Sequence, residues 1–203
     1  MFISSEDNDS VDNWMSINEC VWSGPKCLRA TPCLEKYYPE HQSLLRDSLR
    51  LGDADIKTLV SEARRITPND SIDQITQIFI AISKYLEISN TGSAVQSLAE
   101  CPIFPVVTGS FRSDFDSLYA AAGTDMWFIA DRMYLKESFD SLVPLLAVHP
   151  EIVEKLSPFI DALELERRLL SKVAKGVSKT KGRVELHHDY TRSLRKKARC
   201  IAR

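Results

Sequence analysis

The stretch that decides the fold runs from Ser71 to Ile88 and reads SIDQITQIFIAISKYLEI. Its apolar residues recur at helical spacing along one stripe, which comprises Ile75, Ile78, Phe79, Ile82 and Leu86 and is broadened by Ile72, Ile80 and Tyr85. Ser71 and Gln74 form the capping-box pattern that starts a helix. β-branched isoleucine would also suit a strand, but the length and the i, i+3, i+4 recurrence favour a helix. A helix with so broad an apolar face is nearly surrounded by protein, so we expect it at the centre of the core.

A second helical pattern precedes this stretch. Asp53 is a good N-cap, and the apolar residues that follow it again fall on one stripe. That stripe comprises Ile56, Leu59, Val60, Ala63 and Ile66. Further upstream we expect a short helix within residues 28–38, ending before Pro39, and another over residues 40–51, closed by Gly52.

Helical patterns also follow the central stretch. A short helix is expected over residues 92–98. After Asp131 the pattern again predicts helix, and the helical region includes Leu145 and Leu146. Ser157, which a proline follows, is the expected N-cap of a long helix that Gly176 closes.

Two segments, residues 103–108 and 126–131, are predicted to be short strands because they are β-branched or aromatic and bounded by turn residues. Pro105 has no N–H to donate, so the first strand should lie at a sheet edge or start late. Between them, residues 113–122 are expected to be a turn of helix or a linking loop. The predicted fold class is therefore mainly α, a helical domain with a small number of short β-strands.

The chain of 203 residues divides into three predicted regions. Residues 1–13 are acidic and lack any periodicity, so we expect a disordered leader. Residues 14–176 form the helical globular domain, and residues 177–203 form a basic end with a strand over residues 183–188 and a helix that Asp189 caps. With 44% hydrophobic and 27% charged residues, the chain can bury a core.

Neither a membrane span nor a targeting signal is predicted. The longest clean apolar run, Leu142 to Val148, is far shorter than the roughly 18 residues that a spanning helix needs. The N-terminus turns acidic after three residues, which is the wrong charge for a secretory signal. Five cysteines, an odd number without dense spacing, are typical of reduced thiols. We therefore expect an intracellular protein, cytoplasmic or nuclear, with no contact to a membrane.

Charge is distributed unevenly along the chain. From Ser171 onward the sequence contains eleven Lys or Arg residues but only two acidic residues, Glu185 and Asp189, which gives this end a net charge of +9. The first 170 residues carry the remaining net charge of −11. The basic end lies against the acidic body, is simply a solvated helix, or forms a surface for an acidic partner such as nucleic acid. Tyr190 alone cannot provide a stacking platform for bases. The candidate surface comprises Lys179, Lys181, Arg183, Arg192, Arg195, Lys196, Lys197 and Arg199.

Motifs for catalysis are absent from the sequence. It contains no glycine-rich phosphate loop, no G-x-S-x-G elbow and no H-E-x-x-H pair. The spacing of Cys20, Cys27 and Cys33 does not match a zinc site. The carboxylates of Asp125 and Asp131 would lie about 20 Å apart in an extended segment, too far for a glycosidase pair, and caps are the better interpretation. We expect no catalytic residue, no cofactor and no metal site.

Four segments resemble recurring elements of NO VEIN/sacsin-like proteins, which are large and mostly fungal. These segments are ECVWSGPKCLR at 19–29, WFIADR at 127–132, LLSKV at 169–173 and TRSLRKKAR at 191–199. Together the likeness covers roughly residues 17–203. Proteins of this type carry an Hsp90-like ATPase module near the N-terminus, followed by long helical regions. The resemblance implies a segment outside that module, because the Mg-binding Asn and the Gly-rich nucleotide loops have no counterpart in this chain.

These observations predict a non-catalytic helical scaffold or protein-interaction module, a fragment or truncated relative of a larger multidomain protein. Such a segment would expose apolar surface and bind a protein partner, the missing parts of a larger chain, or a second copy of itself. One alternative is a small accessory protein or enzyme of a fungal metabolic pathway. It predicts a closed cavity lined by some of Cys101, Asp131, Arg132 and His149. The other alternative is nucleic-acid binding through the basic end.

Overall fold

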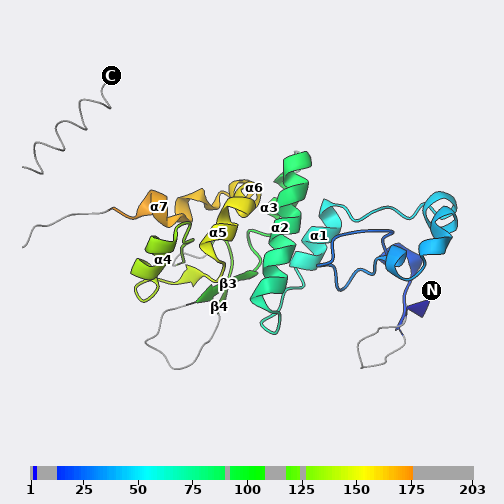
Figure 1. The fold of residues 1–203 in the computed structure, drawn as a ribbon, viewed down its shortest axis with the longest axis horizontal. Helices are drawn as coiled ribbons and strands as arrows, with labels where there is room; N and C mark the ends of the chain where they lie inside the picture. Colours follow the sequence, from blue (N-terminus) through cyan, green and yellow to red (C-terminus); the bar gives the residue numbers. More distant parts are fainter. Residues whose placement is uncertain (1, 4–12, 90–91, 108–117, 124–126, 176–203) are drawn as a thin grey trace, which may run out of the picture. The chain divides into compact units, whose positions relative to one another are not determined.

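The computed structural model describes residues 2–3, 13–89, 92–107, 118–123 and 127–175 (Figure 1). The chain divides into two units, Met1–Val173 and Ala174–Arg203, and only Ala174 and Lys175 of the second unit are described. The strand expected over residues 183–188, the helix expected after Asp189 and the whole candidate basic surface lie outside the described residues, as does Asp125.

The first unit is mainly α with a minor β component, which confirms the predicted fold class. Its α-helices are α1 (Ile56–Ala63), α2 (Ile72–Ile88), α3 (Gly92–Gln96), α4 (Met133–Phe139), α5 (Pro150–Val153), α6 (Ser157–Ala162) and α7 (Leu170–Val173). Short 3₁₀ helices are η1 (Ile17–Glu19), η2 (Leu34–Lys36), η3 (Pro39–His41), η5 (Glu154–Leu156) and η6 (Leu165–Arg168), and η4 (Ser43–Ser48) is a π-helix. The strands are β1 (Phe2–Ile3), β2 (Asn13–Trp14), β3 (Phe104–Val107), β4 (Leu118–Ala120) and β5 (Leu145–Leu146).

Helix α2 lies at the centre of the larger core, as its sequence predicts. The predicted capping box is present: the Gln74 amide donates to Ser71 Oγ (3.3 Å), and the Ser71 amide donates to Gln74 Oε1 (3.1 Å). Ile75, Ile78 and Ile82 are completely buried. Helix α2 packs against both α1 and α6, and Figure 1 shows it between α1 and the part of the unit that contains α5 and α6.

Stacked aromatic rings connect α2 to the rest of this core. Phe79 stacks on Phe159 of α6, with the ring centroids 4.9 Å apart, and lies 5.6 Å from Phe104 of β3. Phe104 in turn stacks on Trp127 at 5.0 Å. Such pairs each contribute about 0.5–1.5 kcal/mol beyond the area they bury. The Arg168 guanidinium covers the indole of Trp127, with Cζ 4.5 Å from the ring centroid.

The sheet of three antiparallel strands has the order β4-β3-β5, so the prediction that Pro105 lies at an edge or before the strand is wrong. The Pro105 carbonyl accepts the Ala147 amide (2.8 Å), which places the proline nitrogen on the β5 side of β3. There β5 has already ended at Leu146, and the missing N–H does not interrupt the pairing of β3 with β4. A proline is tolerated in the central strand because its neighbour is short.

Two predictions near the sheet are also wrong. Residues 118–120 form β4 where a turn of helix or a loop was expected, and Leu145 and Leu146 form β5 where helix was expected. Pairing with β3 decides both cases, because short apolar runs carry no periodicity that separates strand from helix. Residues 127–130 are extended, but Phe128 and Ile129 each form a single bridge to a different partner, so no continuous strand results.

Helix α1 has the predicted buried stripe but a different N-cap. Asp55 caps it by accepting the Thr58 amide (2.8 Å). Asp53, the predicted cap, instead accepts hydrogen bonds from Ser23 Oγ (2.9 Å) and Arg46 Nη2 (2.7 Å). Both aspartates are suitable N-cap residues by type and position. Asp55 caps the helix because Asp53 is engaged by Ser23 and Arg46, which lie elsewhere in the sequence.

The expected long helix from Ser157 to Gly176 is broken into α6, η6 and α7. Glu164 takes a left-handed backbone conformation with φ of 55° and ends the first piece. Ser157 lies inside α6 and is not its N-cap, and its hydroxyl donates to Asp161. The break allows η6 to turn Arg168 into the core, where it is 8% exposed.

A smaller core lies in the segment before α1. It comprises Cys20, Trp22, Leu34, Leu45 and Leu51. The two helices expected within residues 28–38 and 40–51 are shorter than predicted, since only η2, η3 and η4 form there. Within the expected leader, β1 pairs antiparallel with β2, and residues 4–12 between them lie outside the description.

Replacing Arg168 with lysine should destabilise the unit by about 2 kcal/mol. Arg168 Nη1 donates to the Trp127 carbonyl (2.9 Å) and Nη2 donates to the Ala122 carbonyl (2.7 Å). An ammonium group cannot reach both carbonyls with the same geometry, so a buried acceptor loses its donor. The free energy of unfolding in urea measures the effect. Arg167→Lys at the exposed neighbouring position is the control and should change stability by less than about 0.5 kcal/mol; equal losses for both variants would contradict the assignment.

Candidate functional site

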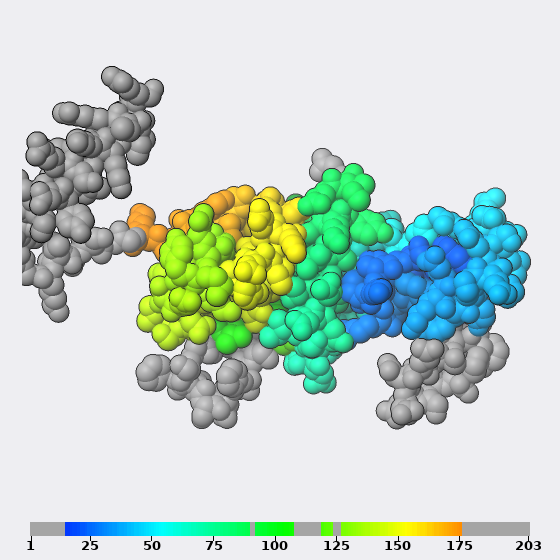
Figure 2. Space-filling model, viewed as in Figure 1, coloured from blue at the N-terminus to red at the C-terminus, as the bar shows by residue number. Residues whose placement is uncertain are grey.

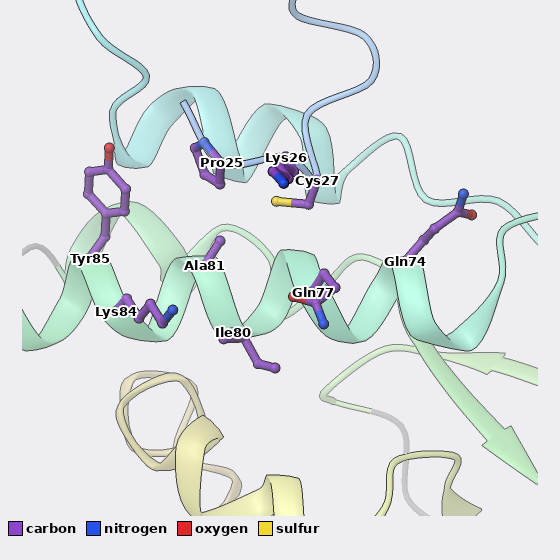
Figure 3. A pocket seen from close by; sticks show the side chains of 9 residues that line it. All are labelled: Pro25, Lys26, Cys27, Gln74, Gln77, Ile80, Ala81, Lys84 and Tyr85. Carbon is purple, nitrogen blue, oxygen red and sulfur yellow. The ribbon is translucent and has the colours of Figure 1, made fainter. Parts of the chain in front are cut away.

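A groove of about 640 Å³ runs between the loop Pro25–Cys27 and helix α2 (Figure 3). Nine residues line it: Pro25, Lys26, Cys27, Gln74, Gln77, Ile80, Ala81, Lys84 and Tyr85. The loop provides one wall and α2 provides the other, as Figure 3 shows. Lys26, Gln74, Gln77 and Lys84 are exposed and form the rim, so the groove is open to solvent.

The loop wall is held close to the body by a glycine. The sequence Ser23-Gly24-Pro25 predicts a turn here. A Cβ atom at Gly24 would lie 2.7 Å from Leu28 Cδ1 and 2.8 Å from Ala54 Cβ, so a larger residue would push the loop away. Figure 2 shows the blue N-terminal segment lying against the green surface of α2. Glycine at this position therefore allows the start of the loop to lie close to Leu28 and Ala54.

A buried carboxylate fixes the far end of the same loop. Glu62 of α1, only 3% exposed, accepts hydrogen bonds from the backbone amides of Arg29 (2.8 Å) and Ala30 (3.2 Å). These are charge-assisted hydrogen bonds, which are about twice as strong as neutral ones. In the sequence, Glu62 stands beside the apolar stripe of α1 with nothing to mark it as buried, so sequence reasoning missed it.

Arg29 adds a second connection at this point. Its Nη1 donates to Asp70 Oδ1 (2.6 Å), and Asp70 Oδ2 accepts the Thr67 amide (2.8 Å). The hydrogen bond from Arg29 lowers the pKa of Asp70 from 3.8 to about 2, supported by the Thr67 amide. Asp70 therefore remains ionised and joins the loop to the turn between α1 and α2.

Tyr85 closes one end of the groove. Its hydroxyl donates to the carbonyl of Ala54, the residue that also touches Gly24. Burial raises the pKa of Tyr85, and the carboxylates of Asp53 and Asp55 raise it further. The phenol therefore stays protonated and keeps its position as a donor.

The charge of the groove differs from that of the body around it. Its lining contains two cations, Lys26 and Lys84, and no carboxylate, although the first 170 residues carry a net charge of −11. The remaining lining is apolar or amide. The groove can therefore accept an apolar group and an anion together.

Three of the four described thiols are not activated for nucleophilic chemistry. Cys20, Cys27, Cys33 and Cys101 are free. Burial raises the pKa of Cys27, which lines the groove, and it also raises the pKa of Cys20 and Cys33. A reactive cysteine needs a lowered pKa, so these three thiols remain protonated near neutral pH. Cys101 Sγ donates to the Ser97 carbonyl (3.6 Å).

A second hollow, of about 580 Å³, lies beside α4, α5 and α6. It brings Asp131 and Arg132 together, but neither Cys101 nor His149 belongs to its lining. Asp131 accepts the Ser171 amide (3.1 Å) in the first turn of α7, which is a capping role. His149 Nδ1 accepts the Glu151 amide (3.4 Å) at the start of α5. Of the four residues expected around an enzymatic cavity, Asp131 and Arg132 thus line one hollow, whereas Cys101 and His149 lie outside it.

Two carboxylates of this hollow have pKa values displaced in opposite directions. Burial raises the pKa of Asp161, and its hydrogen bond with Glu166 adds to the effect. A hydrogen bond from Lys172 lowers the pKa of Glu166. Both carboxylates are exposed to solvent, so they lack the dry environment that strengthens acid–base catalysis.

Neither a metal cluster nor a membrane span is found in the described ranges. No group of three or more His, Cys, Asp or Glu side chains there is placed to hold a metal ion. Within that same part of the chain, no helix combines the length and the apolar character needed to cross a bilayer.

Comparison with known protein families gives one match, over residues 57–174, to the family described as Domain of unknown function (DUF8348). The match covers more than half of the chain. The chain belongs to this family. No curated protein and no solved structure matches the sequence. The DUF8348 region contains nearly all of α1 and all of α2 to α7, and so it provides the helix wall of the groove. The loop wall, Pro25–Cys27, precedes the matched range.

Asp70→Asn should lower the free energy of unfolding by about 1 kcal/mol at pH 7. This expected loss is small because Arg29 is partly exposed, so solvent screens its interaction with Asp70. Because the folded pKa lies below 3.8, the contribution of Asp70 is complete above that pH and is lost as the pH falls through about 2. The difference between wild type and variant should therefore shrink below pH 4. Asp47→Asn, at an exposed position on η4, is the control. A difference that is independent of pH would refute the ion pair's role.

Proposed function

We propose that the chain is a non-catalytic protein-interaction module and that the groove along α2 binds a segment of a partner protein. The observation that supports this proposal is a preformed, mostly apolar groove whose loop wall is anchored by Glu62 and Asp70. Its volume lies within the roughly 300–1,000 Å³ range of ligand sites. A wall fixed before binding loses little conformational entropy when the partner arrives.

The chemistry of the lining favours binding over catalysis. The thiol of Cys27 and the phenol of Tyr85 both have raised pKa values, so neither supplies a nucleophile or a base near neutral pH. The other side chains are aliphatic, amide or ammonium groups. The accessory-enzyme alternative predicts a closed cavity and has less support, because the hollow that Asp131 and Arg132 line also has the exposed carboxylates of Asp161 and Glu166 in its lining. The residues of the nucleic-acid alternative lie outside the described ranges.

A displayed library of random dodecapeptides, selected on the purified full-length chain, tests the proposal. We expect enriched peptides that lose at least about tenfold in affinity when Gln77→Trp places an indole at the rim of the groove. Glu87→Trp, at an exposed position of the same helix away from the lining, is the control and should leave binding unchanged. The proposal fails if no peptide is enriched, or if both tryptophan variants bind the enriched peptides as the wild type does.

A further inference from the structure

We infer that the groove along α2 selects acidic segments that also carry an aliphatic side chain, an inference that rests on the proposed function and specifies the partner's chemistry. Two lysines, one on each wall, define the charge of the groove. Lys26 projects from the loop, and Lys84 projects from α2 (Figure 3). An anion between the walls can therefore interact with both.

No acidic side chain of the lining neutralises these lysines. The other two hollows differ in this respect, since five carboxylates and two cations line the one beside α4 to α6, and two carboxylates and one cation line a third beside α3 and α6. The groove along α2 is thus the one hollow of these three with a positive lining. The first 170 residues carry a net charge of −11, so the positive groove is a local exception on this part of the chain. The groove therefore attracts an acidic segment and repels a basic one.

The floor of the groove determines the apolar part of the preference. Ala81 of α2 points toward the loop Pro25–Cys27, and the ring of Tyr85 closes one end. Ile80 also lines the groove, but its side chain points away from Pro25. An aliphatic side chain placed there would bury apolar surface, which stabilises binding by about 25 cal/mol for each Å² removed from water. Gln77 on the exposed rim carries an amide group that can both donate to and accept from a peptide backbone, whereas the side-chain oxygen of Gln74 already accepts the Ser71 amide.

Fluorescence anisotropy with three labelled peptides tests the inference on the full-length chain. The peptides alternate leucine with glutamate, glutamine or lysine, so that only the charge differs. We expect the glutamate peptide to bind at least about tenfold more tightly than the other two and to weaken as salt is added. Lys26→Glu and Lys84→Glu should each weaken its binding by about threefold to fivefold. Lys155→Glu, an exposed lysine outside all three hollows, should not.

The outcomes separate this inference from the proposed function. If the glutamine or lysine peptide binds as tightly as the glutamate peptide, and Gln77→Trp abolishes that binding, the acidic preference is wrong and the interaction groove stands. If the glutamate peptide binds but neither Lys26→Glu nor Lys84→Glu weakens it, the peptide occupies another basic surface and the inference is overturned. If no peptide binds and the random library gives no enrichment, both proposals fail.

Discussion

The row of rings from Phe159 through Phe79 and Phe104 to Trp127, ending under the Arg168 guanidinium, is the interaction on which the unit depends. It joins α6, α2, β3, the extended segment after residue 126 and η6, which are distant in the sequence. A domain with only short strands and several helices of four to seven residues gains little from local structure alone. The rings supply the long-range contacts that the short elements need.

Because α2 is fixed on one side by these rings, its opposite side is available as a rigid wall. The N-terminal segment is held beside that side by polar connections to α1 and to the turn before α2, chiefly the Glu62 carboxylate and the Arg29–Asp70 pair. The groove therefore forms between a helix inside the DUF8348 range and a loop outside it. The proposed recognition of a partner therefore depends on both parts.

Sequence periodicity was sufficient to predict α2, the buried stripe of α1 and the fold class. Apolar residues at helical spacing form one face of a helix, and that face is buried against the core. It could not identify Glu62 or Arg168, because a charged residue becomes buried only when distant backbone groups satisfy it. Arg167 and Arg168 are adjacent and chemically identical, and the left-handed turn at Glu164 decides which one enters the core. The groove was likewise beyond prediction, as its walls are separated by some fifty residues.

Proline at the second position of the central strand restricts how the sheet can assemble. Pro105 presents only a carbonyl toward β5, so Ala147 donates to that carbonyl but no proline N–H donates in return, and the pair has one hydrogen bond where two are usual. A single missing hydrogen thus limits how far the pairing of β5 with β3 extends, and β5 ends at Leu146.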